Sequence, residues 1–380
     1  MAAIEDTERG QRWASTMAGH PPADDAGHLE TRHAHTDPPR FGPIRAWTRT
    51  DREEAEAATL APGATRSIGS GRRARPEAPD PARTCFERDR DRILHDAAFR
   101  RLAGKTQVFV FPDDHQRTRL THALEVAQVA AALARQLCLH VALTEAIALG
   151  HDCGHGPGGH ASEDAFSPYV EGGYDHAEWG ADVVLQPLNL CAETLDGIRN
   201  HSWSRPTPST PEGEVVAWAD RIAYVCHDFE DAVSAGIVRP DELPALVRER
   251  CGTRRSHQIG AFVDATVTAT VQAGRVAMTA DLAEALAAFR AFDYERIYLR
   301  PASIGQARSV VAMLQALVEH VGQRPHLVPG RPMADPGSPE ALAAAVTWVA
   351  GMTDRFAGQQ AIALLDWPAD ALPGGVDLPR

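Results

Sequence analysis

Four side chains that could together hold a metal ion occur in three stretches of the chain with helical patterns. They are two histidines and two aspartates: His122, His151, Asp152 and Asp220. If the three predicted helices pack side by side, these side chains can project into one interior space, as in the metal sites of helix bundles. Imidazole nitrogens and carboxylate oxygens suit Mn, Mg, Fe or Co. The pattern predicts a divalent metal site, although an adjacent His-Asp pair alone is weak evidence in a chain with 17 histidines.

The segment that follows the His151-Asp152 pair is rich in glycine and histidine, and it reads CGHGPGGH. Glycines allow a close approach of the backbone to a ligand and present His155 and His160 on a tight turn. No Gly-Lys-Ser/Thr follows, which argues against a P-loop nucleotidase. If a helix restarts there, His160 and Glu163 would meet as a proton-handling pair, and the alternative is an ordinary surface pair.

Two long predicted helices, at about 117–139 and 212–233, would position His122 and Asp220. In the first, apolar residues at helical intervals predict a buried stripe formed by Leu120, Leu124, Ala127, Ala131 and Ala134. In the second, the residues available for packing are Val216, Ala219, Ala223, and Cys226 or Phe229. The opposite face carries a polar line of Asp220, Tyr224, Asp228 and Asp231.

The other elements are also predicted to be mainly helical, so the expected fold class is all-α. Thr144 is a plausible N-cap of the short helix that ends at His151. The pattern after Arg83 predicts a helix and then a short strand or hairpin at Thr106 to Phe111. Alanine-rich helical patterns recur at 281–292, 303–320 and 339–350. The tail from Pro368 is expected to be loose.

The composition suggests three regions along the chain. Residues 1–80 are rich in Pro, Arg, His, Asp and Gly and lack apolar periodicity, so they are predicted to form a disordered arm. Residues 81–240 would form the catalytic core, and residues 241–380 would be a helical C-terminal region that completes the fold.

The charge and the cysteines constrain the partners and the compartment. A net charge of -13 repels nucleic acid, so binding of a polyanion is possible only at a local Arg and Lys cluster. Six cysteines without a CxxC pair favour reduced thiols in a cytoplasm. The sequence contains neither the apolar stretch of a signal peptide near its start nor a run long enough to span a bilayer. We therefore expect a soluble, cytoplasmic protein with no membrane partner.

Several motifs, in order along residues 83–366, resemble the HD superfamily and, more narrowly, the deoxyguanosinetriphosphate triphosphohydrolase (dGTPase) family. They are FRRLAGKTQVF at 99–109, RTRLTHALEVAQ at 117–128, HDCGHGPGGHASE at 151–163, DRIAYVCHD at 220–228 and AGMTDRFA at 350–357. The resemblance implies an HD-domain helical core with additional C-terminal helices. Because members of this family often form multimers, it also implies a homo-oligomer.

The resemblance also implies a role for individual residues. His122, His151, Asp152 and Asp220 would hold the metal. The acid-base group beside the scissile phosphate would consist of His160, Glu163 and His176. The nucleotide would lie against Gln107 and Arg119, with His155 near the phosphates and Tyr224 and Asp228 near the sugar. Arg221 matches a position that usually carries a basic phosphate contact or a neighbour of one.

Three positions depart from the family pattern. Gly159 stands where the family usually has Phe, which would loosen the packing behind His160. Ala177 replaces an Asn beside His176, and Thr347 stands where Asp is frequent. The first two departures could alter activity or base preference without affecting the predicted metal ligands, and Thr347 is the lesser change.

The expected reaction is hydrolysis of a deoxynucleoside triphosphate (dNTP), dGTP or another, to deoxynucleoside and tripolyphosphate. Water would attack the α-phosphorus, and an imidazolium at His160 or His176 would protonate the departing deoxynucleoside oxygen. Another HD phosphohydrolase, such as a nucleotidase or phosphodiesterase, is an alternative. A nucleotide-sensing or DNA-associated protein with weakened catalysis is a further alternative, favoured by Gly159 and Ala177 but opposed by the presence of all four predicted ligands.

Overall fold

The computed structural model describes residues 7–21, 31–39, 42, 44–110, 112, 115–330 and 334–374. The chain divides into two units, Met1–Trp47 and Thr48–Arg380. The described part of the first unit contains helix α2 (Glu8–Thr16), which begins where the hydroxyl of Thr7 accepts a hydrogen bond from the backbone N–H of Gly10. A single bridge joins His20 and His33. For this unit, the flexible arm stays a prediction.

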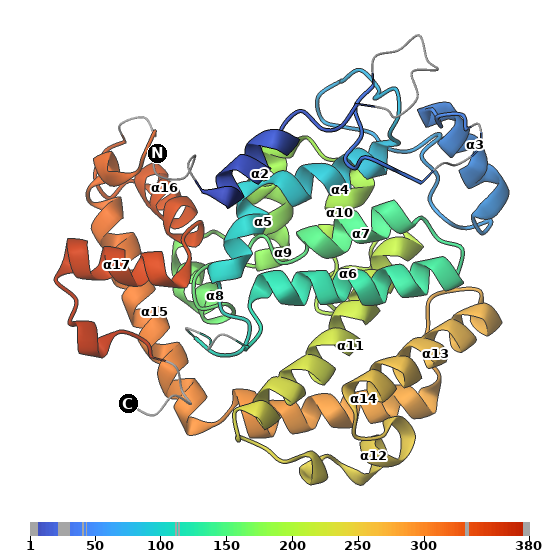
Figure 1. Cartoon of the computed structure of the whole chain (residues 1–380). Helices are drawn as coiled ribbons and strands as arrows, with labels where there is room; N and C mark the ends of the chain where they lie inside the picture. Colours follow the sequence, from blue (N-terminus) through green and yellow to red (C-terminus); the bar gives the residue numbers. More distant parts are fainter. Residues whose placement is uncertain are drawn as a thin grey trace. The chain divides into compact units, whose positions relative to one another are not determined.

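The described part of the second unit is built from helices, and only isolated bridges occur in place of strands (Figure 1). The helices are α3 (Arg49–Thr59), α4 (Cys85–His95), α5 (Ala97–Arg101), α6 (Arg119–Gln136), α7 (Val141–Gly150), α8 (Ala161–Phe166), α9 (His176–Trp179), α10 (Ala192–Arg199), α11 (Pro211–Ser234), α12 (Ala245–Cys251), α13 (Arg255–Ala273), α14 (Ala280–Asp293), α15 (Pro301–Gly322), α16 (Pro339–Ala350) and α17 (Asp354–Leu365). The predicted all-α fold class is confirmed, and the predicted C-terminal helices correspond to α14, α15 and α16.

Helices α6, α7 and α11 pack against one another and form the centre of the larger hydrophobic core (Figure 1). Small alanines on α6, among them Ala123, Ala130 and Ala134, are fully buried and allow this close packing. A second core lies among α8, α15, α16 and α17. The three helices predicted to carry the metal ligands are therefore neighbours in space.

The buried face of α6 differs in part from the predicted stripe. Ala127, Ala131 and Ala134 are buried, but the side chain of Leu124 is 46% exposed. The buried face instead includes Arg119 and His122. A search for apolar residues misses this face because it carries polar side chains.

Helix α7 begins earlier than predicted, because His140 and not Thr144 is its N-cap. The Nδ1 atom of His140 accepts a hydrogen bond from the backbone N–H of Leu143 at 3.3 Å. The other ring nitrogen lies 2.9 Å from Glu56, which holds the ring in place. Thr144 lies inside the helix, where its hydroxyl donates to the carbonyl oxygen of His140.

Residues 48–80 belong to the body of the second unit, which differs from the predicted arm ending at residue 80. The backbone N–H and the hydroxyl of Thr65 donate hydrogen bonds to the fully buried carboxylate of Glu212. Arg73 forms a buried ion pair with Asp89 at 2.7 Å. Polar contacts attach this segment to the body. Such contacts leave no apolar periodicity in the sequence, so the pattern gave no sign that the segment is folded.

The predicted strand or hairpin after residue 105 is not observed in the described residues of that segment. Thr106 forms one bridge with Thr118, and residues 107–110 are bends. The hydroxyl of Thr106 donates instead to Asp354 at 2.5 Å, which joins the segment to the start of α17. Phe111 lies outside the described residues.

Candidate active site

The structure brings the four predicted metal ligands together where α6, α7 and α11 meet. His122 lies in the first turn of α6, His151 directly follows α7, and Asp220 lies in the middle of α11. The Nε2 atom of His122 is 3.0 Å from Oδ1 of Asp220. The Nε2 atom of His151 is 3.7 Å from the same oxygen and 3.5 Å from Oδ1 of Asp152. Ligand atoms of His122, His151 and Asp220 lie within 4.8 Å of one another, as do those of His151, Asp152 and His201, so two groups that could each hold an ion share His151.

The hydrogen bonding of His151 fits a divalent metal ion. The Nδ1 atom of His151 donates to the carbonyl oxygen of Ala148 at 2.6 Å, which leaves the buried Nε2, without a hydrogen-bond partner among the described residues, as the nitrogen available to a metal. A backbone carbonyl that fixes the tautomer in this way is typical of metal-binding histidines.

Both carboxylates of the cluster stay ionised. Burial opposes the charge of Asp220, but the hydrogen bond from His122 and the nearby His151 hold its pKa below the ordinary value. Burial likewise opposes the charge of Asp152, and the guanidinium of Arg119 holds its pKa well below the ordinary value. Two carboxylates and two imidazoles form a donor set that suits Mn, Mg, Fe or Co.

The three residues predicted to handle protons also form a cluster, which contacts the metal-ligand cluster. Glu163 accepts a hydrogen bond from Nδ1 of His176 and lies 3.5 Å from Nδ1 of His160. The rings of His155 and His176 stack with centroids 3.7 Å apart. Asp152 links the two clusters, because its Oδ1 is 3.2 Å from Nε2 of His155. The side chain of His160 is 73% exposed, so it faces solvent at the edge of the site.

Glu163 is itself favoured in its ionised form and favours the charged form of His176. Burial raises the pKa of Glu163, yet the hydrogen bonds from His160 and His176 outweigh burial and lower it. Burial acts to lower the pKa of His176, but the contact with Glu163 raises it above the ordinary value. An imidazolium next to a carboxylate is therefore favoured at position 176.

His201 is a site residue that the sequence reasoning missed. Its Nδ1 donates to the carbonyl oxygen of Ile198 at 2.8 Å, and its Nε2 lies 3.3 Å from Nε2 of His176. Burial and the neighbouring histidines lower the pKa of His201 to about 4, so the ring is neutral and its Nε2 can accept a hydrogen bond. It also lies close enough to His151 and Asp152 to contact the same ion. The local sequence NHSW carried no glycine or charge pattern that would have marked it.

Gly159 and Arg119 are packed together, which explains one departure from the family pattern. Arg119 is 2% exposed and donates to Asp152 at 2.7 Å. Gly159 has a φ of +64°, and a Cβ atom there would lie 2.8 Å from Nη2 of Arg119. The position behind His160 is therefore filled by Arg119, whereas the sequence suggested looser packing.

The residues predicted near the sugar lie on the face of α11 that carries Asp220. The hydroxyl of Tyr224 accepts a hydrogen bond from Arg290 at 2.7 Å. One oxygen of Asp228 accepts from Tyr298 at 2.5 Å, and burial raises the pKa of Asp228 to about 7. The sequence did not identify Arg290 or Tyr298, because no spacing relates α14 and the residues after it to α11.

Gln107 and Arg221, the other two predicted substrate contacts, have polar atoms without a partner among the described residues. The amide oxygen of Gln107 is buried and accepts no hydrogen bond from that part of the chain. The same holds for Nε of Arg221, whose guanidinium carbon lies 3.5 Å from the ring centre of Trp203.

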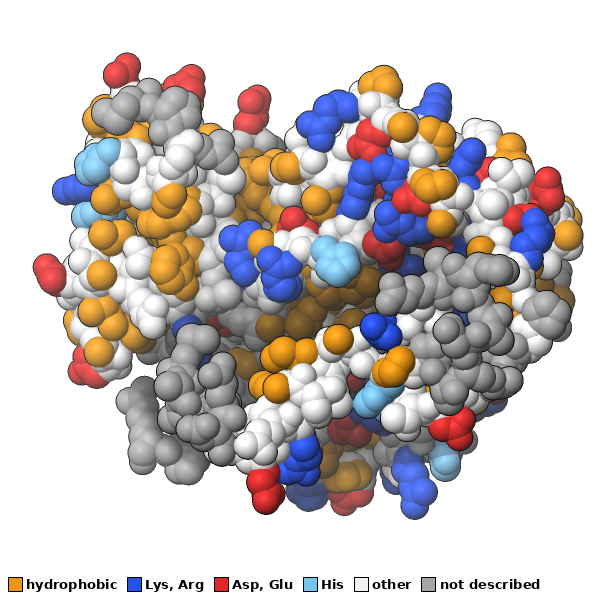
Figure 2. Space-filling model, turned by 45° about the horizontal axis from the view of Figure 1, so that its top comes forward, with side chains coloured by type: hydrophobic (Ala, Val, Ile, Leu, Met, Phe, Trp, Pro, Cys, Tyr) orange, Lys and Arg blue, Asp and Glu red, His pale blue; other side chains and the backbone are white. Residues whose placement is uncertain are grey.

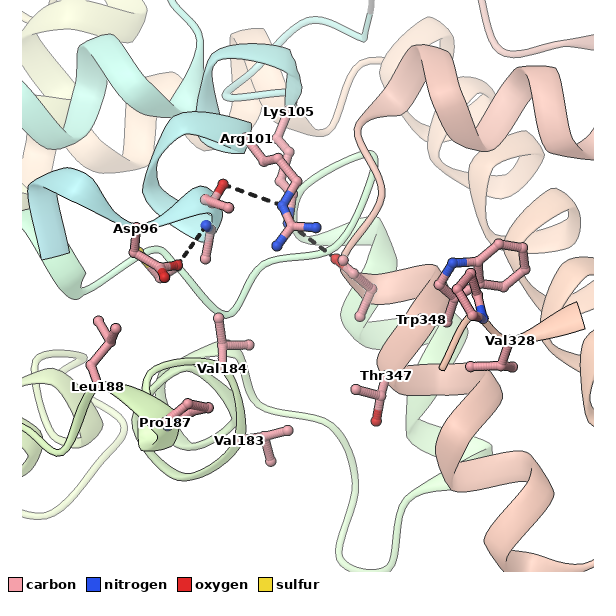
Figure 3. A pocket seen from close by; sticks show the side chains of 16 residues that line it. Asp96, Arg101, Lys105, Val183, Val184, Pro187, Leu188, Val328, Thr347 and Trp348 are labelled. Atoms are coloured by element: carbon pink, nitrogen blue, oxygen red, sulfur yellow. Dashed lines mark hydrogen bonds between the residues drawn. The ribbon is translucent and has the colours of Figure 1, made fainter. Parts of the chain in front are cut away.

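Lys105 lines a cavity of about 370 Å³ whose lining contains none of the predicted site residues (Figure 3). Its ammonium donates to the carbonyl oxygens of His155 and Ala350, and burial lowers its pKa to about 8. Because these carbonyls hold the ammonium, Lys105 supports the turn that carries His155. The third departure from the family pattern, Thr347, lines this cavity and not the metal cluster.

Comparison with known proteins identifies the family. The HD domain model matches residues 119–225, and the phosphohydrolase-associated domain model matches residues 276–361. A deoxyguanosinetriphosphate triphosphohydrolase-like protein of Caldanaerobacter subterraneus is 40% identical over 80% of this chain and 92% of its own length. The chain belongs to this family. A Deinococcus radiodurans relative named deoxyguanosinetriphosphate triphosphohydrolase-like protein 1 is 36% identical over 82% of this chain and 97% of its own.

The dGTPase-like family supports the coarser function: the chain is a hydrolase of the HD phosphohydrolase type. HD domains bind divalent metals, and the His and Asp cluster described above could hold one. The second domain match covers most of α14 to α17, so the C-terminal helices belong to the family fold.

The surface and the helices bear on the expected partners. Acidic and basic side chains are interspersed on the face shown in Figure 2, without a continuous basic area among the residues coloured there. None of the described helices combines the length and the apolar character that crossing a membrane requires.

Proposed function

We propose that this protein hydrolyses a deoxynucleoside triphosphate to the deoxynucleoside and tripolyphosphate with the help of a divalent metal ion. One observation supports this proposal above the others: a metal-ready cluster of two histidines and two ionised carboxylates adjoins both Arg119 and the Glu163–His176 pair. The names of the relatives suggest dGTP as one candidate substrate.

His122, His151, Asp152 and Asp220 would hold the ion, which would polarise a phosphoryl oxygen and lower the pKa of an attacking water. Arg119 would contact the phosphates through nitrogens that have no partner in the described chain. Arg221 would approach the phosphates from α11. His155 would lie near the phosphates, where burial keeps its pKa well below the ordinary value and the ring neutral. Gln107 would contact the nucleotide, and Tyr224 and Asp228 would bind the sugar.

The departing deoxynucleoside oxygen needs a proton, and the cluster around Glu163 would supply it. His160 is at the solvent edge, where it can reach a bound nucleotide and exchange its proton with water. Glu163 would orient His160 and, at the same time, keep His176 charged. General acid catalysis of this kind contributes roughly 10² to 10⁴ in rate.

The partners and the compartment complete the proposal. We expect a homo-oligomer, as the resemblance implies. A nucleotide substrate and six free cysteines fit a reducing cytoplasm.

Product analysis tests this function. Purified protein with Mn or Mg is incubated with each of the four dNTPs, and the products are separated by ion-exchange chromatography. The proposal requires equal amounts of deoxynucleoside and tripolyphosphate. Orthophosphate or a nucleoside monophosphate as first product would indicate another HD phosphohydrolase, and binding without turnover would indicate a sensing protein.

A further inference from the structure

The loop between α10 and α11, residues 200–210, contributes two aromatic side chains to the candidate site. His201 points to His176, as described above. Two residues later, the indole N–H of Trp203 donates to the carbonyl oxygen of Ala217 at 3.0 Å, and its ring meets Trp218 edge to face at 4.7 Å. Arg205 binds Glu178 and lies 3.6 Å from Asp175, which attaches the loop to α9. The loop is therefore held on both sides.

Trp203 is fixed in position although 47% of its surface is exposed. Its free face is covered in part by Arg221, whose guanidinium carbon lies 3.5 Å from the ring centre. At this distance the ring and the guanidinium are in stacking contact, and the negative face of the indole attracts the cation. Arg221 directly follows the predicted ligand Asp220 on α11.

Arg221 has no carboxylate partner in the part of the chain that the structure describes, and its Nε is buried without a hydrogen bond. Arg119 and Arg117, by contrast, are paired with carboxylates: Arg119 with Asp152, and Arg117 with Glu125, Glu230 and Asp231. A carboxylate partner occupies N–H donors and neutralises the charge, whereas an aromatic face orders the guanidinium without doing either.

We propose that Trp203 is a positioning residue that holds Arg221 ready to bind the phosphate groups of the substrate. The proposal rests on the function given above, because it takes a polyphosphate as the group that Arg221 meets. Trp203 acts through Arg221 and needs no contact of its own with the phosphates. A competing role, stacking of Trp203 on the nucleobase, would make the ring a direct contact and give a different experimental result.

Inorganic tripolyphosphate is the probe that separates these roles, because it has phosphates but no base. Its dissociation constant for the Mn-loaded protein is measured by isothermal titration calorimetry for the wild type, Trp203→Ala, Arg221→Ala and the double variant. Loss of the stacking contact should weaken binding by roughly 2- to 30-fold. In the Arg221→Ala background, Trp203→Ala should have no further effect, since the residue it positions is gone.

Two further variants separate positioning from a general loss of structure. Trp203→Phe keeps an aromatic face and should restore most of the affinity. Trp367→Ala removes another partly exposed tryptophan, beyond the end of α17, and should leave the affinity unchanged. The Mn content of all variants, measured by mass spectrometry, should equal that of the wild type.

Equal losses from Trp203→Ala in both backgrounds would overturn the proposal, because Trp203 would then act independently of Arg221. Unchanged tripolyphosphate affinity with weakened dNTP binding would overturn it in favour of base stacking. The comparison of the four proteins measures binding and needs no turnover, so it decides the role of Trp203 even if the protein hydrolyses no dNTP. Absence of hydrolysis would reject the proposed function alone.

Discussion

Replacement of Asp220 by alanine tests the convergence of the metal site most directly, because Asp220 is 68 residues away in sequence from its nearest proposed co-ligand. Its Oδ1 lies 3.0 Å and 3.7 Å from the Nε2 atoms of His122 and His151. Mutation of residues that merely support metal ligands typically costs 10- to 100-fold in metal affinity. Loss of a ligand should cost more, at least about 10²-fold, and should abolish hydrolysis.

The fold should survive this substitution. Leaving Nε2 of His122 without its partner costs about 1–3 kcal/mol. The favourable helix propensity of alanine in the middle of α11 and the removal of a buried charge offset part of this cost. We therefore expect the midpoint of thermal unfolding without metal to change by only a few degrees.

The assay combines metal analysis with thermal unfolding. Wild-type protein should retain one Mn after gel filtration and should unfold at a higher temperature when Mn is added, because an ion that binds only the folded state stabilises it. Asp220→Ala should show neither effect. Asp264→Ala, which removes an exposed aspartate from the interior of α13, is the matched control and should behave like the wild type. Stoichiometric Mn and undiminished turnover in Asp220→Ala would remove Asp220 from the site.

Three further predictions concern the acid group, the N-terminal segment and a buried carboxyl. His160→Gln should keep its metal and lower the rate of the chemical step by roughly 10² to 10⁴, and full activity would transfer the acid role to His176. Removal of residues 1–47 should leave the unfolding temperature nearly unchanged. Removal of residues 1–75 should lower it clearly, because Glu212 and Asp89 then lose their contacts with Thr65 and Arg73. Equal unfolding midpoints for the two shortened proteins would contradict the packing of residues 48–75 against the body. Burial raises the pKa of Asp228 from 3.8 to about 7, so between these pH values the folded state holds a proton that the unfolded state releases. The free energy of unfolding should therefore fall by a few kcal/mol as the pH rises from 4 to 7. Urea unfolding of Asp228→Asn should show a weaker dependence on pH, and identical pH profiles for this variant and the wild type would refute the raised pKa.

Elements whose side chains follow one simple period could be predicted from the sequence. The packing residues of α11, from Val216 to Phe229, are buried as the helical spacing required. The three C-terminal helices agree closely with their predicted ranges because alanine and leucine favour helices and proline and glycine end them. The four predicted ligands converge because each lies on or next to one of three helices that pack together.

Elements held by polar contacts could not be predicted in this way. His140 caps α7 only because Glu56 and Ser67 hold its ring, and neither is close to it in sequence. Leu124 was assigned to the buried stripe but is exposed, and the buried face of α6 carries Arg119 and His122 instead. His201 reaches the site because the loop between α10 and α11 carries it there, and no pattern in the neighbouring residues indicates the course of that loop.

The charge balance of the candidate site reconciles an acidic chain with a highly anionic substrate. Three ionised carboxylates, Asp152, Asp220 and Glu163, are balanced by the guanidiniums of Arg119 and Arg221 and by the imidazolium favoured at position 176. Without a metal the cluster is therefore close to neutral and offers phosphates little net attraction. With the ion bound, the balance becomes positive, and the unpartnered nitrogens of both arginines become favourable contacts for phosphate oxygens. On the proposed function, metal and nucleotide binding are thus coupled by electrostatics. The net charge of -13 does not by itself oppose the substrate, because exposed charges farther from the site than the screening length of about 8 Å contribute little there.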